Sequence, residues 1–321
     1  MASEQRGSGF VPPGYTLLNK LGSGQTSHVH LARHGVFGEV ALKLPRPEIQ
    51  QRPVLKRMFE NEVSITVKLL SPSIVTAYDG YPTGENAFLA LEYCSGGTLD
   101  QLLLEQGKLP LERAYNLILD VATGLTHTHE RSVLHRDVKP ANVFLTGAGK
   151  AKLGDFGTGV FMADEGEERV GTAFYMAPEV FEGRSSGVKS DIYSLGVLAY
   201  EVIAGRRPFI ADTYEALMVA HHTEVPKDLR TFRPDVDPQV VRLVAKAMTR
   251  DPEKRFQQTR QFLEALRGIM GVDPHDTGDG TPSAPVTGRS SRAVKTEAPV
   301  QKEPGRKGGG GLFGWIKRGR G

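Results

Sequence analysis

VLHRDVKPANV is the sequence of residues 133–143, and LGDFG follows at residues 153–157. The two stretches contain two carboxylates, Asp137 and Asp155, one carboxamide, Asn142, and three basic side chains. This order of residue types is very improbable by chance. These two stretches therefore decide the fold, and the rest of the sequence is interpreted outward from them.

A glycine-containing segment lies upstream, at residues 21–29, with the sequence LGSGQTSHV. Glycines between two strands let backbone N–H groups approach anionic phosphates closely. A simple hairpin turn explains this segment equally well, and Ser27 stands where a G-x-G-x-x-G pattern would have its third glycine. The segment becomes informative together with Lys43, which ends the sequence VALK on the third predicted strand.

In this order the segments resemble the protein kinase family, with its H-R-D-x-x-x-x-N catalytic loop and its D-F-G magnesium loop. The resemblance runs from about Tyr15 to about Met270 and favours the bacterial type of serine/threonine protein kinase. It implies an α+β, bilobal protein kinase fold within residues 13–270. The N-lobe, about 13–93, would be a small antiparallel sheet with one helix, and the C-lobe, about 94–270, would be mainly helical.

The resemblance also assigns catalytic roles. Asp137 would orient the substrate hydroxyl and accept its proton, and Lys139 would screen the γ-phosphate. Lys43 would pair with the α- and β-phosphates while Glu62, on the following helix, holds its ammonium group. Glu60 is the rival partner, but the spacing to the Ser-Pro-Ser-Ile-Val segment that begins at residue 71 favours Glu62.

The implied cofactors are ATP and Mg²⁺, with Mn²⁺ as a substitute for Mg²⁺. Asn142 and Asp155 are the expected metal ligands, because Mg²⁺ prefers oxygen donors. Most of the expected nucleotide-binding positions would also suit a plain hydrophobic core, and we expect the thiol of Cys94 to serve packing, since it has no basic neighbour in sequence. These positions are Leu21, Gly22, Ser23, Gly24, Val29, Ala41, Lys43, Leu91, Glu92, Cys94 and Leu145.

The acceptor class follows from the D-x-K-P-x-N pattern at residues 137–142, which resembles serine/threonine kinases more than tyrosine kinases. Residues 171–179, GTAFYMAPE, resemble the segment that receives a protein substrate, with Thr172 close to Asp137 and Lys139. Asp191 resembles the helix aspartate that braces the catalytic loop, and Arg255 resembles the partner of Glu179. We therefore expect phosphorylation of serine and threonine in proteins, including autophosphorylation.

Two other classes of function fit parts of the pattern. A pseudokinase scaffold would bind nucleotide at most, and a small-molecule kinase would phosphorylate a metabolite. The complete set of Lys43, Asp137, Asn142 and Asp155 argues against a scaffold, and residues 171–179 favour a peptide acceptor. The histidine pairs at 28/30 and 127/129 lack a third ligand at metal-site spacing, so we do not expect a metal there.

The segment between Asp155 and Glu179 departs from many kinases. Its only serine or threonine residues are Thr158 and Thr172, while four acidic residues lie between 164 and 168. One hypothesis is that a native carboxylate pairs with Arg136 and replaces an activating phosphothreonine. A solvated acidic loop is the equally weighted alternative.

Local sequence patterns predict the individual elements. Glycine-punctuated apolar runs predict three strands over Tyr15–Leu44, and two more are expected at Ile74–Tyr81 and Ala87–Glu92. A helix is expected from about Pro53 and ends before Ser71-Pro72. Helical periodicity in the second half predicts a helix entered through Pro110 and further helices at Ser190–Ala204, Gln239–Met248 and Thr259–Met270.

Composition limits the remaining function classes. A net charge of +3 over 321 residues does not point to nucleic acid, and a single cysteine excludes an internal disulfide and suits the cytoplasm. No apolar stretch is long enough for a transmembrane helix. We expect disorder at residues 1–12 and in the basic tail, 271–321, where Leu312–Arg320 is a candidate weak membrane or protein anchor. The oligomeric state is not indicated.

Overall fold

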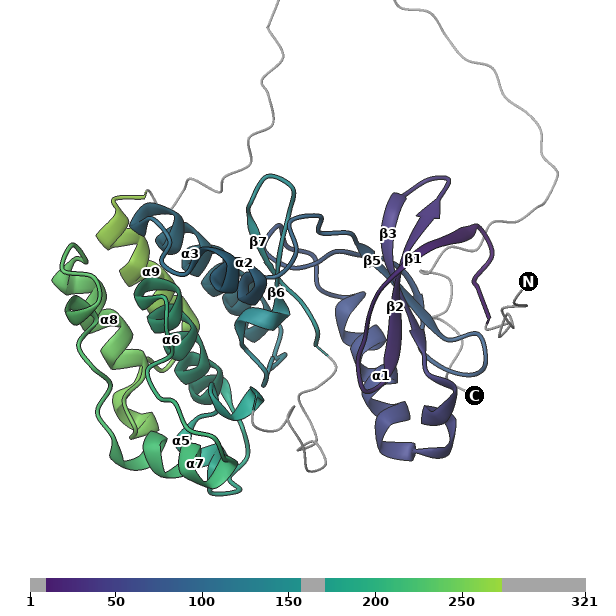
Figure 1. The fold of residues 1–321 in the computed structure, drawn as a ribbon. Coiled ribbons are helices and arrows are strands. Elements are labelled where there is room, and N and C mark those ends of the chain that lie inside the picture. Colours follow the sequence, from purple (N-terminus) through teal and green to yellow (C-terminus); the bar gives the residue numbers. More distant parts are fainter. Residues whose placement is uncertain (1–9, 157–170, 273–321) are drawn as a thin grey trace, which may run out of the picture. The chain divides into compact units, whose positions relative to one another are not determined.

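The computed structural model describes residues 10–156 and 171–272. Its N-terminal part is a five-stranded antiparallel sheet in the order β1-β2-β3-β5-β4 (Figure 1). Neighbouring strands in this order are mostly consecutive in the chain, as short hairpin connections require. The strands are β1 (Tyr15–Ser23), β2 (Ser27–His34), β3 (Gly38–Pro45), β4 (Ala77–Tyr81) and β5 (Phe88–Glu92).

The register of the sheet sorts its residues onto two faces. Val29 on β2 pairs with Lys43 on β3, which pairs with Leu89 on β5. Ala41 pairs with Leu91 two positions along, so these side chains share one face. The alternate residues, among them Val40, Leu42 and Ala90, are fully buried in a separate cluster with Tyr15 on the other face.

The helix α1 (Pro53–Thr66) packs on the face that carries Lys43. A short 3₁₀ helix, η1 (Pro47–Gln51), precedes it, and Pro53 occupies its first position, where the missing N–H costs nothing. Phe59 and Val63 of α1 pack against Leu89 and Leu91 of the sheet. This packing fixes the direction in which Glu62, between them on the helix, can point.

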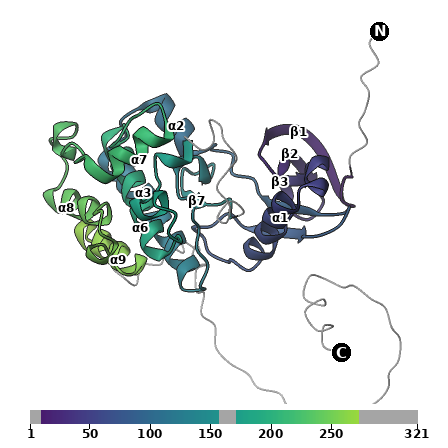
Figure 2. The same ribbon diagram turned by 90° about the horizontal axis from the view of Figure 1, so that it is seen from below.

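The C-terminal part is mainly helical and has one large core (Figures 1 and 2). Its central helix, α6 (Val188–Ala204), is buried along nearly its whole length, and α3 (Leu111–His129) and α8 (Pro238–Ala247) pack against it. The short hairpin of β6 (Val143–Leu145) and β7 (Ala151–Leu153) carries the connection between the two sequence stretches that decide the fold. The helices are α2 (Leu99–Gln106), α3 (Leu111–His129), α5 (Pro178–Phe181), α6 (Val188–Ala204), α7 (Tyr214–Thr223), α8 (Pro238–Ala247) and α9 (Thr259–Met270), with 3₁₀ turns η2 (Pro140–Asn142), η3 (Leu229–Thr231) and η4 (Pro252–Lys254).

Gly196 within α6 and Gly205 directly after it each have a structural reason to be glycine. A Cβ atom at Gly196 would lie 2.8 Å from the Cβ of Ala247, so its absence lets the end of α8 approach α6 closely. Gly205 follows the last residue of α6 with a φ of +69°, and its N–H donates to the carbonyl of Glu201. This left-handed glycine caps the C-terminal end of α6.

The predicted fold class is confirmed: an antiparallel sheet with one α-helix precedes a mainly helical part. The helix predicted from Pro110 and those at 190–204, 239–248 and 259–270 are present, with small shifts at their ends. No helix was predicted at α7, although Thr213 caps it by accepting a hydrogen bond from the N–H of Ala216. None of the helices in the described ranges is long and apolar enough to cross a bilayer.

The predicted strand at Ile74–Tyr81 is wrong at its beginning. The β4 strand starts only at Ala77, and Ile74 instead forms a parallel bridge with Leu153. The N–H of Val75 donates to the carbonyl of Leu153, and the N–H of Leu153 donates to the carbonyl of Ser73. The backbone groups of residues 73–75 therefore form hydrogen bonds with Leu153 of the C-lobe. Strand periodicity does not reveal such a long-range pairing.

Stability should fall on acidification partly because of His221 on α7, which is fully buried with its Nδ1 2.7 Å from the Tyr193 hydroxyl. Burial lowers the pKa of His221 from 6.5 to about 4. Below pH 6.5 the imidazole is therefore protonated in the unfolded chain but not in the folded chain. The free energy of unfolding then falls by about 1.4 kcal/mol per pH unit between pH 6.5 and pH 4.

We expect the variant His221→Gln to lose less stability than the wild type between pH 6.5 and pH 4. Urea unfolding at several pH values measures this difference. Identical pH slopes for the two proteins would contradict the assignment to His221.

Candidate active site

Lys43 is the residue at which the sheet, α1 and the D-F-G stretch meet. Its ammonium group forms an ion pair with Glu62 of α1, 19 positions along the chain. The same Nζ lies 3.2 Å from Oδ1 of Asp155, 112 positions along the chain. Glu60, the rival partner considered from the sequence, lies two positions away on α1 and is partly exposed.

One ammonium group thus serves two carboxylates in a confined space. Burial would lower the pKa of Lys43, but the charges of Asp155 and Glu62 raise it, so Lys43 stays protonated. Burial raises the pKa of Glu62 against the pull of Lys43. Burial also opposes ionisation of Asp155, yet Lys43, with help from His135 and Lys139, holds its pKa below the ordinary value.

The catalytic-loop segment forms a second cluster around Asp137. Nζ of Lys139 lies 2.8 Å from Oδ2 of Asp137 and donates to Oγ1 of Thr172 at 2.9 Å. Nδ2 of Asn142 donates to Oδ2 of Asp137 at 2.9 Å and to its backbone carbonyl at 2.8 Å. Two side chains therefore hold the Asp137 carboxylate, and one of them also reaches the segment 171–179.

The two clusters are adjacent. The N–H of Gly154 donates to the carbonyl of Asn142 at 3.0 Å, so Asp155 follows directly on the loop that carries Asn142. Both hydrogen-bond partners of the Asn142 amide nitrogen are acceptors, which leaves the amide oxygen turned away from Asp137. Asp155 has a φ of +62°, and 30% of its side chain is exposed.

His135 contacts the residues on both sides of Asp155. It is fully buried, its Nε2 lies 3.0 Å from the carbonyl of Gly154, and its ring packs against Phe156 at a centroid distance of 4.9 Å. Sequence analysis gave His135 no separate role. The H-R-D motif itself is the signal that could have drawn attention to it.

Asp191 on α6 fixes the backbone of the catalytic loop. Its Oδ2 accepts the N–H of His135 at 2.9 Å, and its Oδ1 accepts the N–H of Arg136 at 2.7 Å. Arg136 has a φ of +66°, a left-handed conformation that is costly for any residue other than glycine. The hydrogen bonds that the N–H groups of His135 and Arg136 donate to Asp191 offset that cost next to Asp137.

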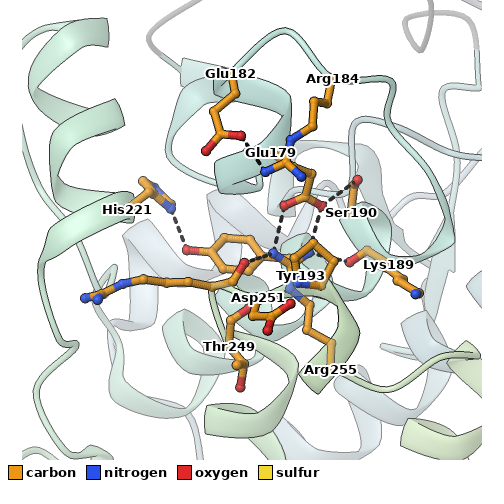
Figure 3. A network of polar contacts seen from close by, with 12 residues as sticks. Glu179, Glu182, Arg184, Lys189, Ser190, Tyr193, His221, Thr249, Asp251 and Arg255 are labelled. Carbon is orange, nitrogen blue, oxygen red and sulfur yellow. Dashed lines mark hydrogen bonds and ion pairs between the residues drawn. The ribbon is translucent and has the colours of Figure 1, made fainter.

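The segment 171–179 is anchored through Glu179 (Figure 3). Both carboxylate oxygens of Glu179 accept hydrogen bonds from Arg255 at 2.8 Å, and Oε1 also accepts one from Ser190. Burial opposes ionisation of Glu179, but Arg255 outweighs burial and lowers its pKa. The guanidinium of Arg255 also lies over the ring of Tyr193, whose hydroxyl contacts His221.

The expected nucleotide-binding residues lie in several parts of the structure. Val29, Ala41, Lys43 and Leu91 share one face of the sheet, as the register shows. The N–H of Glu92 donates to the carbonyl of Thr76 at 2.8 Å, so this N–H is already engaged within the N-lobe.

Cys94 is buried, and burial raises the pKa of its thiol to about 11, so the thiol is packed and protonated. Leu145 is buried in the C-lobe core and binds Gly96 and Gly97 through its backbone. Leu21, Ser23 and Gly24 are exposed, and Gly22 is half-buried, so this end of the sheet is open.

From the sequence alone, His129 was considered only as a metal ligand, and its contacts within the fold are different. Its Nε2 lies 2.8 Å from Oδ2 of Asp191 and its Nδ1 lies 2.6 Å from Oγ1 of Thr259. These partners are 62 and 130 positions away, so no local pattern could reveal them. Within the described ranges no group of three or more His, Cys, Asp or Glu side chains could hold a metal ion.

Several predictions fall outside the described residues. These are the acidic residues 164–168, which were paired with Arg136 as one hypothesis, the residue Thr158, and both chain ends, including the candidate anchor Leu312–Arg320.

Comparison with known families matches residues 15–265 to the protein kinase domain. The chain belongs to the protein kinase family. The match covers both the sheet and the helical part, including all the clusters described above.

Similar kinases have been curated in several bacteria. The chain is 35% identical over 277 residues to the serine/threonine-protein kinase drp72 of Corynebacterium efficiens, covering 83% of this chain and 53% of that protein. It is 34% identical over 263 residues to the serine/threonine-protein kinase PknB of Mycolicibacterium smegmatis, covering 78% and 42%. It is 33% identical over 300 residues to the serine/threonine-protein kinase PknA of Corynebacterium glutamicum, covering 90% and 61%. The aligned part of the chain thus spans roughly half the length of these relatives.

Removing one partner of the Glu179–Arg255 pair should strongly destabilise this kinase domain. Arg255→Met would leave Glu179 buried without its cation, and breaking such a pair on one side costs about 3–5 kcal/mol. The surface pair between Lys189 and Glu253, at 2.8 Å, offers a matched control, because removing an exposed partner costs under about 1 kcal/mol.

Urea unfolding of Arg255→Met and Lys189→Met measures the contrast. Replacing both members of the buried pair, as Glu179→Gln with Arg255→Met, should recover part of the loss. Equal destabilisation by the two single variants would contradict the contribution assigned to the buried pair.

Proposed function

We propose that this chain is a serine/threonine protein kinase that transfers the γ-phosphoryl group of ATP to hydroxyl groups of proteins. The observation that carries the proposal is the adjacency of two polar clusters. Lys43 contacts Asp155 at 3.2 Å, and Asn142, whose carbonyl accepts from Gly154, holds Asp137 at 2.9 Å. Phosphoryl transfer needs this combination of positioning and charge neutralisation rather than a covalent intermediate.

Asp137 is the group that would act on the acceptor. Asn142 and Lys139 hold its Oδ2, and so fix the orientation of the carboxylate that would receive the hydrogen bond of a substrate hydroxyl. As the hydroxyl oxygen bonds to the γ-phosphorus, its proton would pass to this carboxylate, the bond from the γ-phosphorus to the β–γ bridging oxygen would break, and ADP would leave. Positioned general-base assistance of this type contributes roughly 10²- to 10⁴-fold in rate.

Asn142 and Asp155 fit a Mg²⁺ ion, and Mn²⁺ is proposed as a substitute. The amide oxygen of Asn142 faces away from Asp137, and the partly exposed Asp155 is held ionised by Lys43. One carboxylate and one amide suit a cation that takes its other ligands from phosphates and water. When bound, the ion neutralises phosphate charge, and Lys43 contributes a further cation to the α- and β-phosphates.

The adenine base would lie on the face of the sheet that carries Val29, Ala41 and Leu91. The carbonyl of Glu92 and the backbone of Cys94 would bind its edge, with Leu145 of the C-lobe beneath it. Leu21, Gly22, Ser23 and Gly24 would cover the phosphates. The apolar character and shared orientation of the sheet residues support this placement.

The acceptor class rests on Lys139 and the segment 171–179. Lys139 joins Asp137 to Thr172, so the base and the peptide-receiving segment are held by one side chain. The names of the similar proteins support serine and threonine as acceptors. Autophosphorylation of the same chain and action in the cytoplasm are part of the proposal.

Transfer of label from γ-labelled ATP to a protein substrate tests the proposed reaction. Asp137→Asn should lower kcat by about 10²-fold or more, because the amide cannot accept the proton. Acid hydrolysis of the product should release labelled phosphoserine or phosphothreonine. A wild-type enzyme that binds ATP and transfers nothing would support the scaffold alternative, and label on a metabolite alone would support the small-molecule kinase.

The two glutamates of α1 supply a matched pair of variants. Glu62→Gln removes the carboxylate that holds Lys43 and should lower kcat/KM by about tenfold or more, since Lys43 then loses one of the two carboxylates that it contacts in the described part of the chain. Glu60→Gln makes the same chemical change two positions away and should leave kcat/KM within about twofold. Steady-state kinetics with varied ATP compares them, and the reverse ranking would assign Lys43 to Glu60.

A further inference from the structure

A chain of buried hydrogen bonds runs from the last helix to the catalytic loop. Oγ1 of Thr259, the first residue of α9, lies 2.6 Å from Nδ1 of His129, the last residue of α3. Nε2 of His129 lies 2.8 Å from Oδ2 of Asp191 on α6. The same oxygen accepts the N–H of His135. Four separate elements of the fold are therefore joined through one imidazole.

The hydrogen-bonding capacities of the groups give the chain a direction. Asp191 is an acceptor, so Nε2 of His129 carries the proton that it donates to Oδ2. In the neutral imidazole Nδ1 is then an acceptor, and the hydroxyl of Thr259 must donate to it. A residue without a hydroxyl at position 259 would leave Nδ1 buried without a donor.

The carboxylate of Asp191 needs this third donor to hold its orientation. Its two backbone donors, the N–H groups of His135 and Arg136, both lie on the catalytic loop. The bond from His129 approaches from α3 and fixes the carboxylate from outside the loop. Arg136 is in the left-handed region at a φ of +66°, so a carboxylate free to turn would release strain next to Asp137.

We propose that His129 and Thr259 are positioning residues for the catalytic loop, which makes the geometry of Asp137 depend on the docking of α9. Neither touches the reacting atoms. Their effect passes through Asp191 to the backbone of His135 and Arg136. The proposal rests on the kinase function proposed above, but it also predicts a property of the loop that does not require transfer activity.

Two neighbouring contacts make it possible to distinguish an effect of His129 and Thr259 on the catalytic loop from a general loss of stability. A surface ion pair between Arg260 and Glu130 also joins α9 to the end of α3, and it does not touch His129. Thr126, one turn before His129 on α3, is buried, and its hydroxyl donates only within α3, to the carbonyl of Ala122 at 2.7 Å. Thr126→Val therefore removes a buried hydroxyl without altering the chain to Asp191.

The test compares Thr259→Val with Thr126→Val, at equal concentrations of folded protein. We expect Thr259→Val to lower kcat about ten- to a hundredfold, as small misplacement of a catalytic group does, while the Kd for ATP changes less than about twofold. Thr126→Val should lower the Tm and leave kcat close to the wild type. Thr259→Ser, which keeps the hydroxyl, should restore kcat.

His129→Phe is a second variant, because phenylalanine keeps the ring and removes both nitrogens. It should reproduce the loss of kcat seen in Thr259→Val. Hydrogen exchange of the His135 and Arg136 amides provides a readout independent of transfer. These amides should exchange faster in Thr259→Val and His129→Phe than in Thr126→Val.

The outcomes are distinct. Equal kcat values and equal amide exchange for Thr259→Val and Thr126→Val would overturn the proposal. A wild-type protein without transfer activity would defeat the proposed kinase function, and the exchange measurement would still decide whether His129 and Thr259 position the loop. Loss of kcat in Thr259→Ser equal to that in Thr259→Val would also overturn the role of the hydroxyl.

Discussion

The ammonium group of Lys43 is the constraint on which the site depends. It reaches Glu62 on α1 and Asp155 beside the β6–β7 hairpin at the same time, so it ties the sheet to both. Two carboxylates facing one ammonium leave an excess of negative charge, and burial together with the charge of Asp155 raises the pKa of Glu62. A cation bound at Asp155, as proposed, would relieve that excess, which is a physical reason to expect metal and nucleotide to bind together.

The buried carboxylates of Glu179 and Asp191 are also held by hydrogen-bond donors from distant parts of the chain. Arg255 donates two hydrogen bonds to the carboxylate of Glu179, and the hydroxyl of Ser190 donates a third. Asp191 is compensated mainly by backbone N–H groups and His129. Such groups are costly to desolvate, so they hold one geometry only where every partner is present. The helical lobe thus supports its catalytic loop from beneath with a satisfied polar network.

Backbone strain is concentrated where the chemistry is proposed. Ser132, Arg136 and Asp155 are the non-glycine residues with positive φ in the described part of the chain, and two of them adjoin or belong to the site. Strained residues of this kind persist only where surrounding contacts fix them. Asp191 supplies those contacts for Arg136, and Lys43 contacts the side chain of Asp155. Positioning of the loops therefore depends on residues that lie far away in sequence.

The sequence by itself determined the fold class, most helices and the identity of Lys43, Asp137, Asn142 and Asp155 as a group. Contiguous motifs carry those residues, and a 3.6-residue period or a glycine cap is a local property of the chain. Only the tertiary structure decided that Ile74 pairs with Leu153, that His129 joins Thr259 to Asp191, and which amide atom of Asn142 faces Asp137. These contacts join residues that are distant in sequence or depend on side-chain orientation, and local residue patterns contain no information about either.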